Sequence, residues 1–321
     1  MTLILGVTAS GKGRLAFRLA QQIDAEIISI DSMKVYRRMD IGTAKPPKEA
    51  RAMLKYHLID IIEPGDSFNV GLFLEHSSSA IKQIKRRNLP IVAVGGTALY
   101  IKALLYGLFE GPGTDEKIRN QLQQRAEAEG LKQLYRQLET VDSIAAQRIH
   151  PNDAKRIIRA LEVYELTGKP ISALQQQWKN DAGNDWTIIG LRSDKAEANR
   201  RINSRVKKMI AAGLIDEVKS LLAEDKPLSK QAQCAIGYAE IIDYLNGKTS
   251  LEDATELIKK NTRRLAKNQR TWFKTFKNIN WLALNPEEPP EKTLTRIMAL
   301  LNNINPDLAD ESSTSDTNLI A

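Results

Sequence analysis

Short apolar runs alternate with amphipathic segments along the chain. Four runs rich in β-branched or small apolar residues predict buried strands, at residues 2–5, 26–30, 90–94 and 187–191. Helical spacing of apolar positions follows the first run, where Leu15, Leu19 and Ile23 fall on one face. Runs that alternate with helices in this way predict a parallel sheet with helices on both faces.

The pattern changes at residue 114, beyond which helical spacing dominates and no convincing strand appears before residue 178. Gly130 and the run 168–170 (GKP) are helix stops within this stretch. We therefore predict that an all-helical domain, residues 114–177, is inserted between two parts of an α/β core, residues 1–113 and 178–305. The second part is predicted to be largely helical, with helices at 195–212, 215–223, 238–246 and 251–276 and a late strand at 279–283.

Charge is distributed unevenly over the 321 residues. The total of 47 Lys+Arg and 39 Asp+Glu gives a net charge of +8. Residues 306–321 hold four acidic residues and no basic one, so they are predicted to form a disordered acidic tail, and the rest of the chain is more basic than the total. A basic body is weak evidence for a nucleic-acid partner by itself.

Composition excludes several classes of protein. With 27% charged residues and its longest apolar stretch, 89–108, broken by glycines and a lysine, the chain is expected neither to span a membrane nor to be wholly disordered. Only five residues precede the first glycine, which leaves no room for a signal sequence, so we expect a cytoplasmic protein. The single cysteine, Cys234, excludes an intramolecular disulfide and a multi-cysteine metal site.

Residues 6–13, GVTASGKG, match the phosphate-loop pattern G-x-x-x-x-G-K between a predicted strand and a predicted helix. Such a loop points backbone N–H groups at an anion, and Lys12 adds a full charge. The alternative is a glycine turn beside a surface lysine. The Ser or Thr that normally follows the lysine and coordinates Mg²⁺ is replaced by Gly13, so a metal must rely on water, other side chains or substrate oxygens.

Asp31 ends the second predicted strand, at the sheet edge where ligands bind in open α/β folds. In a nucleotide kinase, a carboxylate there could bind Mg²⁺. In alkyl transfer to nitrogen it could accept a proton. The structural alternative is a helix cap formed by Asp31 or Ser32.

Several blocks together resemble the tRNA dimethylallyltransferase family, in order from about residue 3 to 283. They include GVTASGK, ISIDSMKVYRRMDIGTAK, HLID, VGGTALY, HPNDAKRIIRALEVYELTGKPIS, residues 201–213, IGY and TRRLAKNQRTWF. The resemblance implies a P-loop NTPase-like core and transfer of a dimethylallyl group from its diphosphate to N6 of adenosine 37, next to the anticodon. It also implies Mg²⁺ as cofactor, the tRNA anticodon stem-loop as partner, and a monomer.

The resemblance assigns roles to individual residues. Asp31 matches the general base, and Thr97 would lie near the same reaction centre. The diphosphate, rather than ATP, would be held by Gly6, Thr8, Ala9, Ser10, Gly11, Lys12, Gly13 and Arg205. The tRNA would be contacted by Asp31, Ser32, Met33, Lys34, Arg119, Lys155, Arg156, Ile157, Ile158 and Arg159.

Other interpretations stay open. A small-molecule P-loop kinase would explain the phosphate loop and Asp31, but neither the helical insertion nor the TRRLAKNQRTWF block. A tRNA-binding protein that lost catalysis through Gly13 is a third possibility. The helical face made by Arg263, Lys267, Arg270 and Lys274 could contact phosphates or simply be solvated. For Trp272 and Phe273, apolar packing is favoured over stacking on a base.

Overall fold

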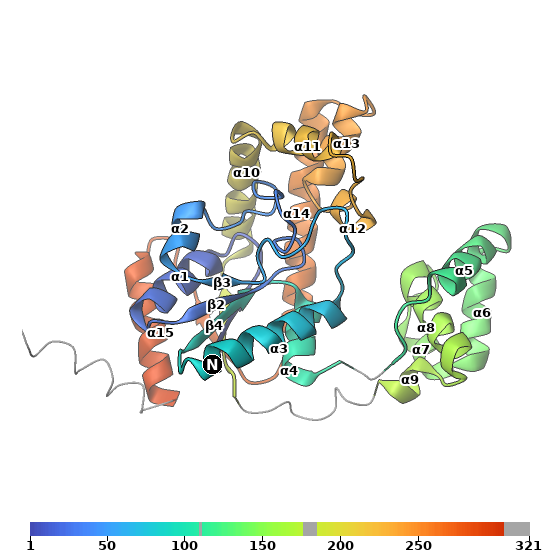
Figure 1. The fold of residues 1–321 in the computed structure, drawn as a ribbon, viewed down its shortest axis with the longest axis horizontal. Coiled ribbons are helices and arrows are strands. Elements are labelled where there is room, and N and C mark those ends of the chain that lie inside the picture. The colour runs from blue at the N-terminus through green and yellow to red at the C-terminus, as the bar shows by residue number, and fades with distance from the viewer. Residues whose placement is uncertain (109–110, 176–184, 305–321) are drawn as a thin grey trace, which may run out of the picture. The chain divides into compact units, whose positions relative to one another are not determined.

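The computed structural model describes residues 1–108, 111–175 and 185–304, and the chain divides into two compact units (Figure 1). We call residues 1–103 and 184–321 the core unit and residues 104–183 the helical unit. The range 114–177 that we predicted as an insertion falls inside the helical unit. The predicted tail, residues 306–321, lies outside the described residues.

The core unit contains a six-stranded parallel sheet in the order β3-β2-β4-β1-β5-β6. Its strands are β1 (Thr2–Gly6), β2 (Glu26–Ile30), β3 (Tyr56–His57), β4 (Ile91–Gly95), β5 (Thr187–Arg192) and β6 (Ile279–Ala283). β1 and β2 are buried along their whole length, as strands covered on both faces must be. The predicted α/β fold with a parallel sheet is therefore confirmed. β3, which has two residues, was not predicted.

The helices of the core unit lie against this sheet or extend beyond its edge (Figure 1). They are α1 (Lys12–Gln22), α2 (Lys48–Met53), α3 (Val70–Arg86), α4 (Ala98–Tyr106), α10 (Lys195–Ala211), α11 (Leu214–Leu222), α12 (Lys230–Gln233), α13 (Tyr238–Leu245), α14 (Leu251–Phe273) and α15 (Pro290–Ile304). α1 and α15 pack together over the sheet, where Leu15 and Leu19 share a core cluster with Ile189, Ile297 and Leu301. None of the described helices is long and apolar enough to cross a membrane.

The helical unit has its own core. Its helices are α5 (Glu116–Ala128), α6 (Leu131–Val141), α7 (Ser143–Arg148), α8 (Ala154–Thr167) and α9 (Ile171–Leu174). Leu122, Leu134, Leu138 and Leu161 are buried together in its interior. Aspartates cap three of the helices, with Asp115, Asp142 and Asp153 accepting N–H groups from the first turns of α5, α7 and α8.

Candidate active site

The carboxyl ends of three neighbouring strands bring the predicted chemical groups together. β2, β4 and β1 are adjacent in the sheet and end, respectively, at Asp31, at the Gly96-Thr97 turn and at the phosphate loop. Parallel strands place all their carboxyl ends at one edge, so residues far apart in sequence meet there. This edge is the candidate active site.

The phosphate loop, residues 7–11, connects β1 to the N-terminus of α1. Ala9 and Gly11 both adopt left-handed backbone conformations, with φ of 61° and 85°. Glycine adopts this conformation freely, whereas at Ala9 it is strained, a cost often found at functional sites. The hydroxyl of Ser10 is buried without a hydrogen-bond partner among the described residues. The loop therefore has the strained backbone and the unsatisfied donor expected where a bound anion completes a site.

Three cations and one carboxylate converge on this loop. The Lys12 ammonium donates to the Val7 carbonyl oxygen at 3.2 Å, and burial, with a smaller effect from Lys34, lowers its pKa to about 7. Burial also lowers the pKa of Lys34 and of Arg205, and the charge of Asp31 opposes the shift in all three cations. Arg205 reaches the loop itself, with Nη1 3.4 Å from the Thr8 hydroxyl oxygen. The excess of buried positive charge suits a ligand with more than one negative charge.

Asp31 is held in a tight turn at the end of β2. Its Oδ1 accepts the N–H groups of Met33 at 2.9 Å and Lys34 at 3.2 Å. The hydroxyl oxygen of Thr97 accepts the N–H of Ser32 at 3.2 Å, so the β4–α4 turn supports the Asp31 turn. A carboxylate fixed in this way, half-buried at the edge of the sheet, can act as a proton acceptor of defined position.

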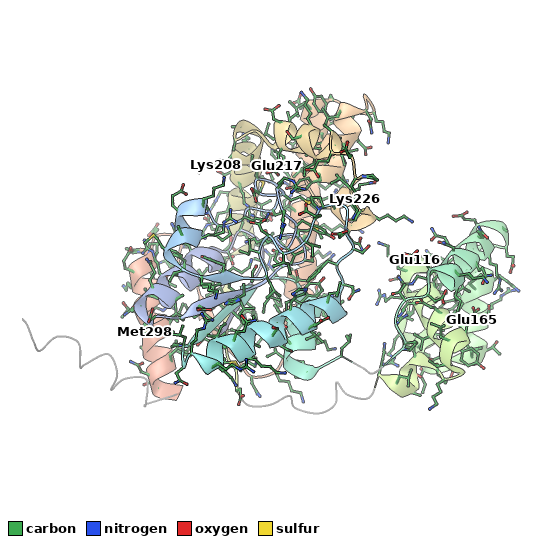
Figure 2. All side chains as sticks on the ribbon, viewed as in Figure 1. Glu116, Glu165, Lys208, Glu217, Lys226 and Met298 are labelled. Atoms are coloured by element: carbon green, nitrogen blue, oxygen red, sulfur yellow. The ribbon has the colours of Figure 1, made fainter. Side chains whose placement is uncertain are left out.

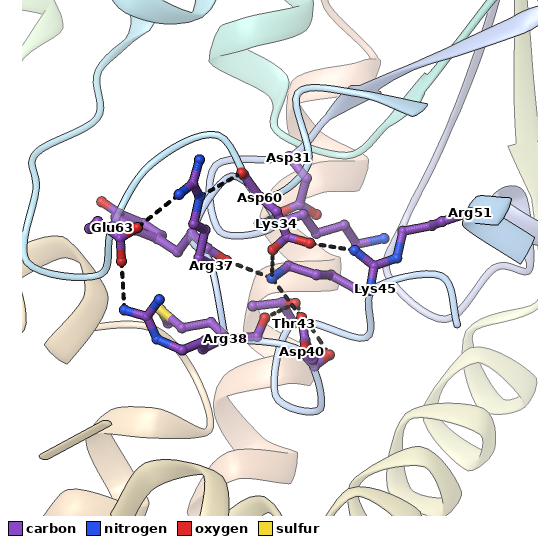
Figure 3. A network of polar contacts seen from close by, with 12 residues as sticks. Asp31, Lys34, Arg37, Arg38, Asp40, Thr43, Lys45, Arg51, Asp60 and Glu63 are labelled. Atoms are coloured by element: carbon purple, nitrogen blue, oxygen red, sulfur yellow. Dashed lines mark hydrogen bonds and ion pairs between the residues drawn. The ribbon is translucent and has the colours of Figure 1, made fainter. Parts of the chain in front are cut away.

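The segment that follows Asp31 is held by a network of polar contacts (Figure 3). The Lys45 ammonium donates to Asp40 at 2.7 Å, to Asp60 at 2.6 Å and to the carbonyl of Tyr36 at 2.5 Å. Glu217 on α11 (Figure 2) accepts three successive backbone N–H groups, those of residues 40, 41 and 42. This segment lines a cavity of about 410 Å³, and Arg205 forms part of the cavity wall.

Gln269 on α14 also belongs to the site, although it was not among the residues predicted from the sequence. Its Oε1 accepts the N–H of Thr8 at 2.8 Å, and its Nε2 donates to the Gly96 carbonyl oxygen at 2.9 Å. It lies on the buried face of α14 with Ala266 and Phe273. A polar residue at a core position of the helical pattern is the signal that could have revealed it.

The predicted RNA-contact residues of the helical unit differ in their surroundings. Arg119 and Arg159 both pair with Glu162, whose side chain is fully buried, at 3.0 Å and 2.6 Å. Ile157 is buried in the core of the unit, and Ile158 is half-buried. Lys155 and Arg156 are exposed, although Arg156 pairs with Asp153.

We predict that Glu162→Ala lowers the free energy of unfolding of the helical unit by about 2–3 kcal/mol. The change leaves two arginines without their shared partner and removes the acceptor of the Asp115 N–H, now at 2.8 Å. Partial exposure of both arginines limits the cost. Chemical denaturation, with hydrogen exchange assigning the loss to residues 115–174, measures it. Glu165→Ala, on the exposed side of α8 (Figure 2), is the control and should change stability by less than about 0.5 kcal/mol. Equal effects of the two changes would contradict the prediction.

The basic positions of α14 do not form one solvated face. Arg263 donates to Asn203 of α10 at 2.6 Å, whereas Lys267 and Lys274 are exposed. Phe273 is buried, as favoured from the sequence. Trp272 is 39% exposed, with the Lys102 ammonium 5.9 Å from its ring centre, so its ring is not a core side chain.

Comparison with known proteins identifies the family. The model of the IPP transferase family matches residues 34–276. A tRNA dimethylallyltransferase of Geobacter metallireducens is 46% identical over 283 residues, which is 88% of this chain and 92% of that protein. A tRNA isopentenylpyrophosphate transferase from Staphylococcus epidermidis aligns with a TM-score of 0.68, at 35% identity and over 94% and 98% of the two chains. A eukaryotic dimethylallyltransferase described as acting on tRNA aligns with a TM-score of 0.78, at 27% identity and over 94% and 79%. This chain therefore belongs to the IPP transferase family, the tRNA dimethylallyltransferases.

Proposed function

We propose that this protein transfers the dimethylallyl group of dimethylallyl diphosphate to N6 of adenosine 37 in tRNA and releases diphosphate. The observation that carries the proposal is the meeting of Asp31 with Lys12, Arg205 and the phosphate loop at one sheet edge. The names of the relatives support the reaction class. The buried cations and the Asp31 carboxylate support the proposed binding of an anion and the proposed transfer of a proton.

In the transfer step, the bond between the allylic carbon and the diphosphate oxygen breaks, and its electron pair stays with diphosphate. Lys12, Arg205 and loop amides stabilise the negative charge that develops there. The N6 lone pair forms the new bond to carbon, and the Asp31 carboxylate accepts the proton that N6 loses. This base matters because the amino lone pair is delocalised into the adenine ring, which makes N6 a poor nucleophile.

The reacting base must leave the anticodon-loop stack to reach the site, which costs little in a single-stranded loop. We propose that residues 31–34, beside the reaction centre, contact the extruded nucleotide, and that Thr97 acts there by supporting the Ser32 N–H. In the helical unit, exposure favours Lys155 and Arg156 as contacts to the anticodon stem-loop. Arg119 and Arg159 would contact RNA while they remain paired with Glu162. Ile157 and Ile158 would pack beneath these basic residues.

Mg²⁺ is proposed as the metal that accompanies the diphosphate. Gly13 offers no side-chain oxygen, and the described residues contain no cluster of three His, Cys, Asp or Glu side chains that could hold an ion. The described side chains therefore do not form a site that would hold Mg²⁺ mainly by themselves. No step of the proposed reaction depends on a metal ion bound in that way. We also propose that the protein is a monomer that acts on tRNA in the cytoplasm.

Incubation with dimethylallyl diphosphate, Mg²⁺ and unmodified tRNA whose anticodon loop carries adenosine at positions 36–38 tests the proposal. Nucleoside mass spectrometry should detect N6-dimethylallyl adenosine, and no ATP should be consumed. ATP turnover without alkylation would instead indicate a small-molecule kinase. Binding of tRNA without either reaction would indicate a protein that lost catalysis.

We predict that Gly13→Thr raises the rate several-fold at limiting Mg²⁺ and changes it little at saturating Mg²⁺. An added Cβ at position 13 meets no atom within 4 Å, so the hydroxyl can be accommodated beside the loop. The measurement is the rate as a function of Mg²⁺ concentration. Gly13→Ala, which adds the carbon without the oxygen, is the control. The same Mg²⁺ dependence in both variants would show that the missing hydroxyl is no handicap.

A further inference from the structure

The side-chain amide of Gln269 joins two active-site loops that come from different strands. It accepts the Thr8 N–H of the phosphate loop and donates to the Gly96 carbonyl of the β4–α4 turn. Both partners are backbone groups of fixed polarity, so they determine which way the amide points. Gln269 is 7% exposed, so neither bond competes freely with water.

The site is built to admit this amide. A Cβ at position 96 would lie 2.6 Å from the Gln269 Nε2, so the absence of a side chain on Gly96 lets the amide approach the turn this closely. The preceding residue shows the same requirement, because a Cβ on Gly95 would lie 2.1 Å from the Ile30 carbonyl oxygen. The two glycines thus bring β4 close to Gln269 and to the end of β2.

The contacts continue from Gln269 to the proposed general base. Thr97 follows Gly96 in the turn, and its hydroxyl oxygen accepts the N–H of Ser32, the neighbour of Asp31. Gln269 therefore adds a side-chain link between the loop proposed to hold the departing diphosphate and the turn next to the proton acceptor, beyond the pairing of the strands themselves. The allylic carbon has to move from one of these groups to a nitrogen beside the other.

We propose that Gln269 is a positioning residue for the transfer reaction, one that fixes the separation between the diphosphate and Asp31. The proposal rests on the proposed function. Misplacement of reacting groups by about 1 Å can slow a reaction roughly 100-fold, and we expect an effect of this size when the two hydrogen bonds of Gln269 are lost. The Thr8 N–H is already bonded to Gln269, so the diphosphate is held by the other loop amides and by Lys12 and Arg205.

Two variants test the proposal. Gln269→Leu removes both bonds at similar volume, and Gln269→Asn keeps the amide on a side chain that is too short to reach both partners. We expect kcat to fall roughly 100-fold in the first and about 10-fold in the second, with tRNA affinity within about twofold of the wild type. Inorganic diphosphate, measured by calorimetry, should bind the leucine variant about 5- to 10-fold more weakly, because the loop is no longer fixed.

Asn280→Leu is the matched control. Asn280 also donates its amide to a backbone carbonyl, that of Ile188 at 3.2 Å, but on β6, which β5 separates from β1. This change should lower the melting temperature without altering kcat. A kcat for Gln269→Leu within about threefold of the wild type, or a loss that Asn280→Leu equals, would overturn the proposal. If the wild type makes no alkylated tRNA, the proposed function is wrong. Unchanged diphosphate affinity in Gln269→Leu would by itself contradict the positioning role of Gln269, whatever the reaction is.

Discussion

Asp31→Asn is expected to lower kcat by about 1000-fold while leaving the affinity for tRNA within about twofold of the wild type. The asparagine oxygen can still accept the N–H groups of Met33 and Lys34, so the turn at the end of β2 is kept. What is lost is the basic oxygen that takes the proton from N6. Loss of one negative charge near the RNA also reduces repulsion toward phosphate, so binding should not weaken. Single-turnover alkylation and filter binding measure the two quantities separately.

Asp194→Asn provides a closely matched control. Asp194 is the second residue after β5, and Asp31 is the first after β2. The Oδ1 of Asp194 likewise accepts the N–H groups two and three residues ahead, at 2.8 Å and 3.0 Å. Its replacement should therefore reproduce any structural effect of the Asp-to-Asn change without touching the reaction. If Asp31→Asn weakened tRNA binding as much as it slowed turnover, the general-base assignment would be wrong.

The parts of the fold that the sequence predicted are those set by local pattern. Runs such as EIISI (residues 26–30) are apolar and β-branched because both faces of the strand are covered, and the phosphate loop has a fixed spacing between its glycines and Lys12. β3 and α2, with two and six residues, are too short to show a period. Their place depends on pairing with β2 and on the network around Lys45, which no local window contains.

Pairing between distant residues limited the prediction of the site in the same way. The resemblance assigned Arg119 and Arg159 to RNA, yet each also holds Glu162, 43 and 3 residues away. Gln269 contacts Thr8 across 261 residues, so nothing near either residue indicates the bond. In both cases the local sign is a polar residue at a buried position of the helix. Glu162 is one such residue on α8, and Gln269 is one on α14.

Lys12→Met is expected to reduce turnover by at least about 1000-fold and yet to raise the free energy of unfolding near neutral pH by about 2 kcal/mol. Burial lowers the pKa of Lys12 from 10.5 to about 7 in the folded, ligand-free protein. Below pH 7 the folded protein therefore holds a buried charge that the unfolded chain exposes to water. The protein keeps this unfavourable charge because the diphosphate needs it, so removal should stabilise the fold while it disables the reaction.

The pH dependence of stability separates this explanation from a simple packing effect. Between about pH 7 and pH 10.5 the unfolded chain binds a proton at Lys12 that the folded protein does not, so this residue makes wild-type stability rise with pH across that window. Lys12→Met should lose that contribution to the slope, whereas Lys219→Met, at an exposed position of α11, should retain it. Bound diphosphate favours the ammonium form of Lys12 and should therefore raise the pKa of this residue. Binding of diphosphate above about pH 7 should then be accompanied by uptake of a proton. If Lys12→Met left the slope of stability against pH unchanged and lowered stability near neutral pH, the buried Lys12 ammonium would not be destabilising the ligand-free protein.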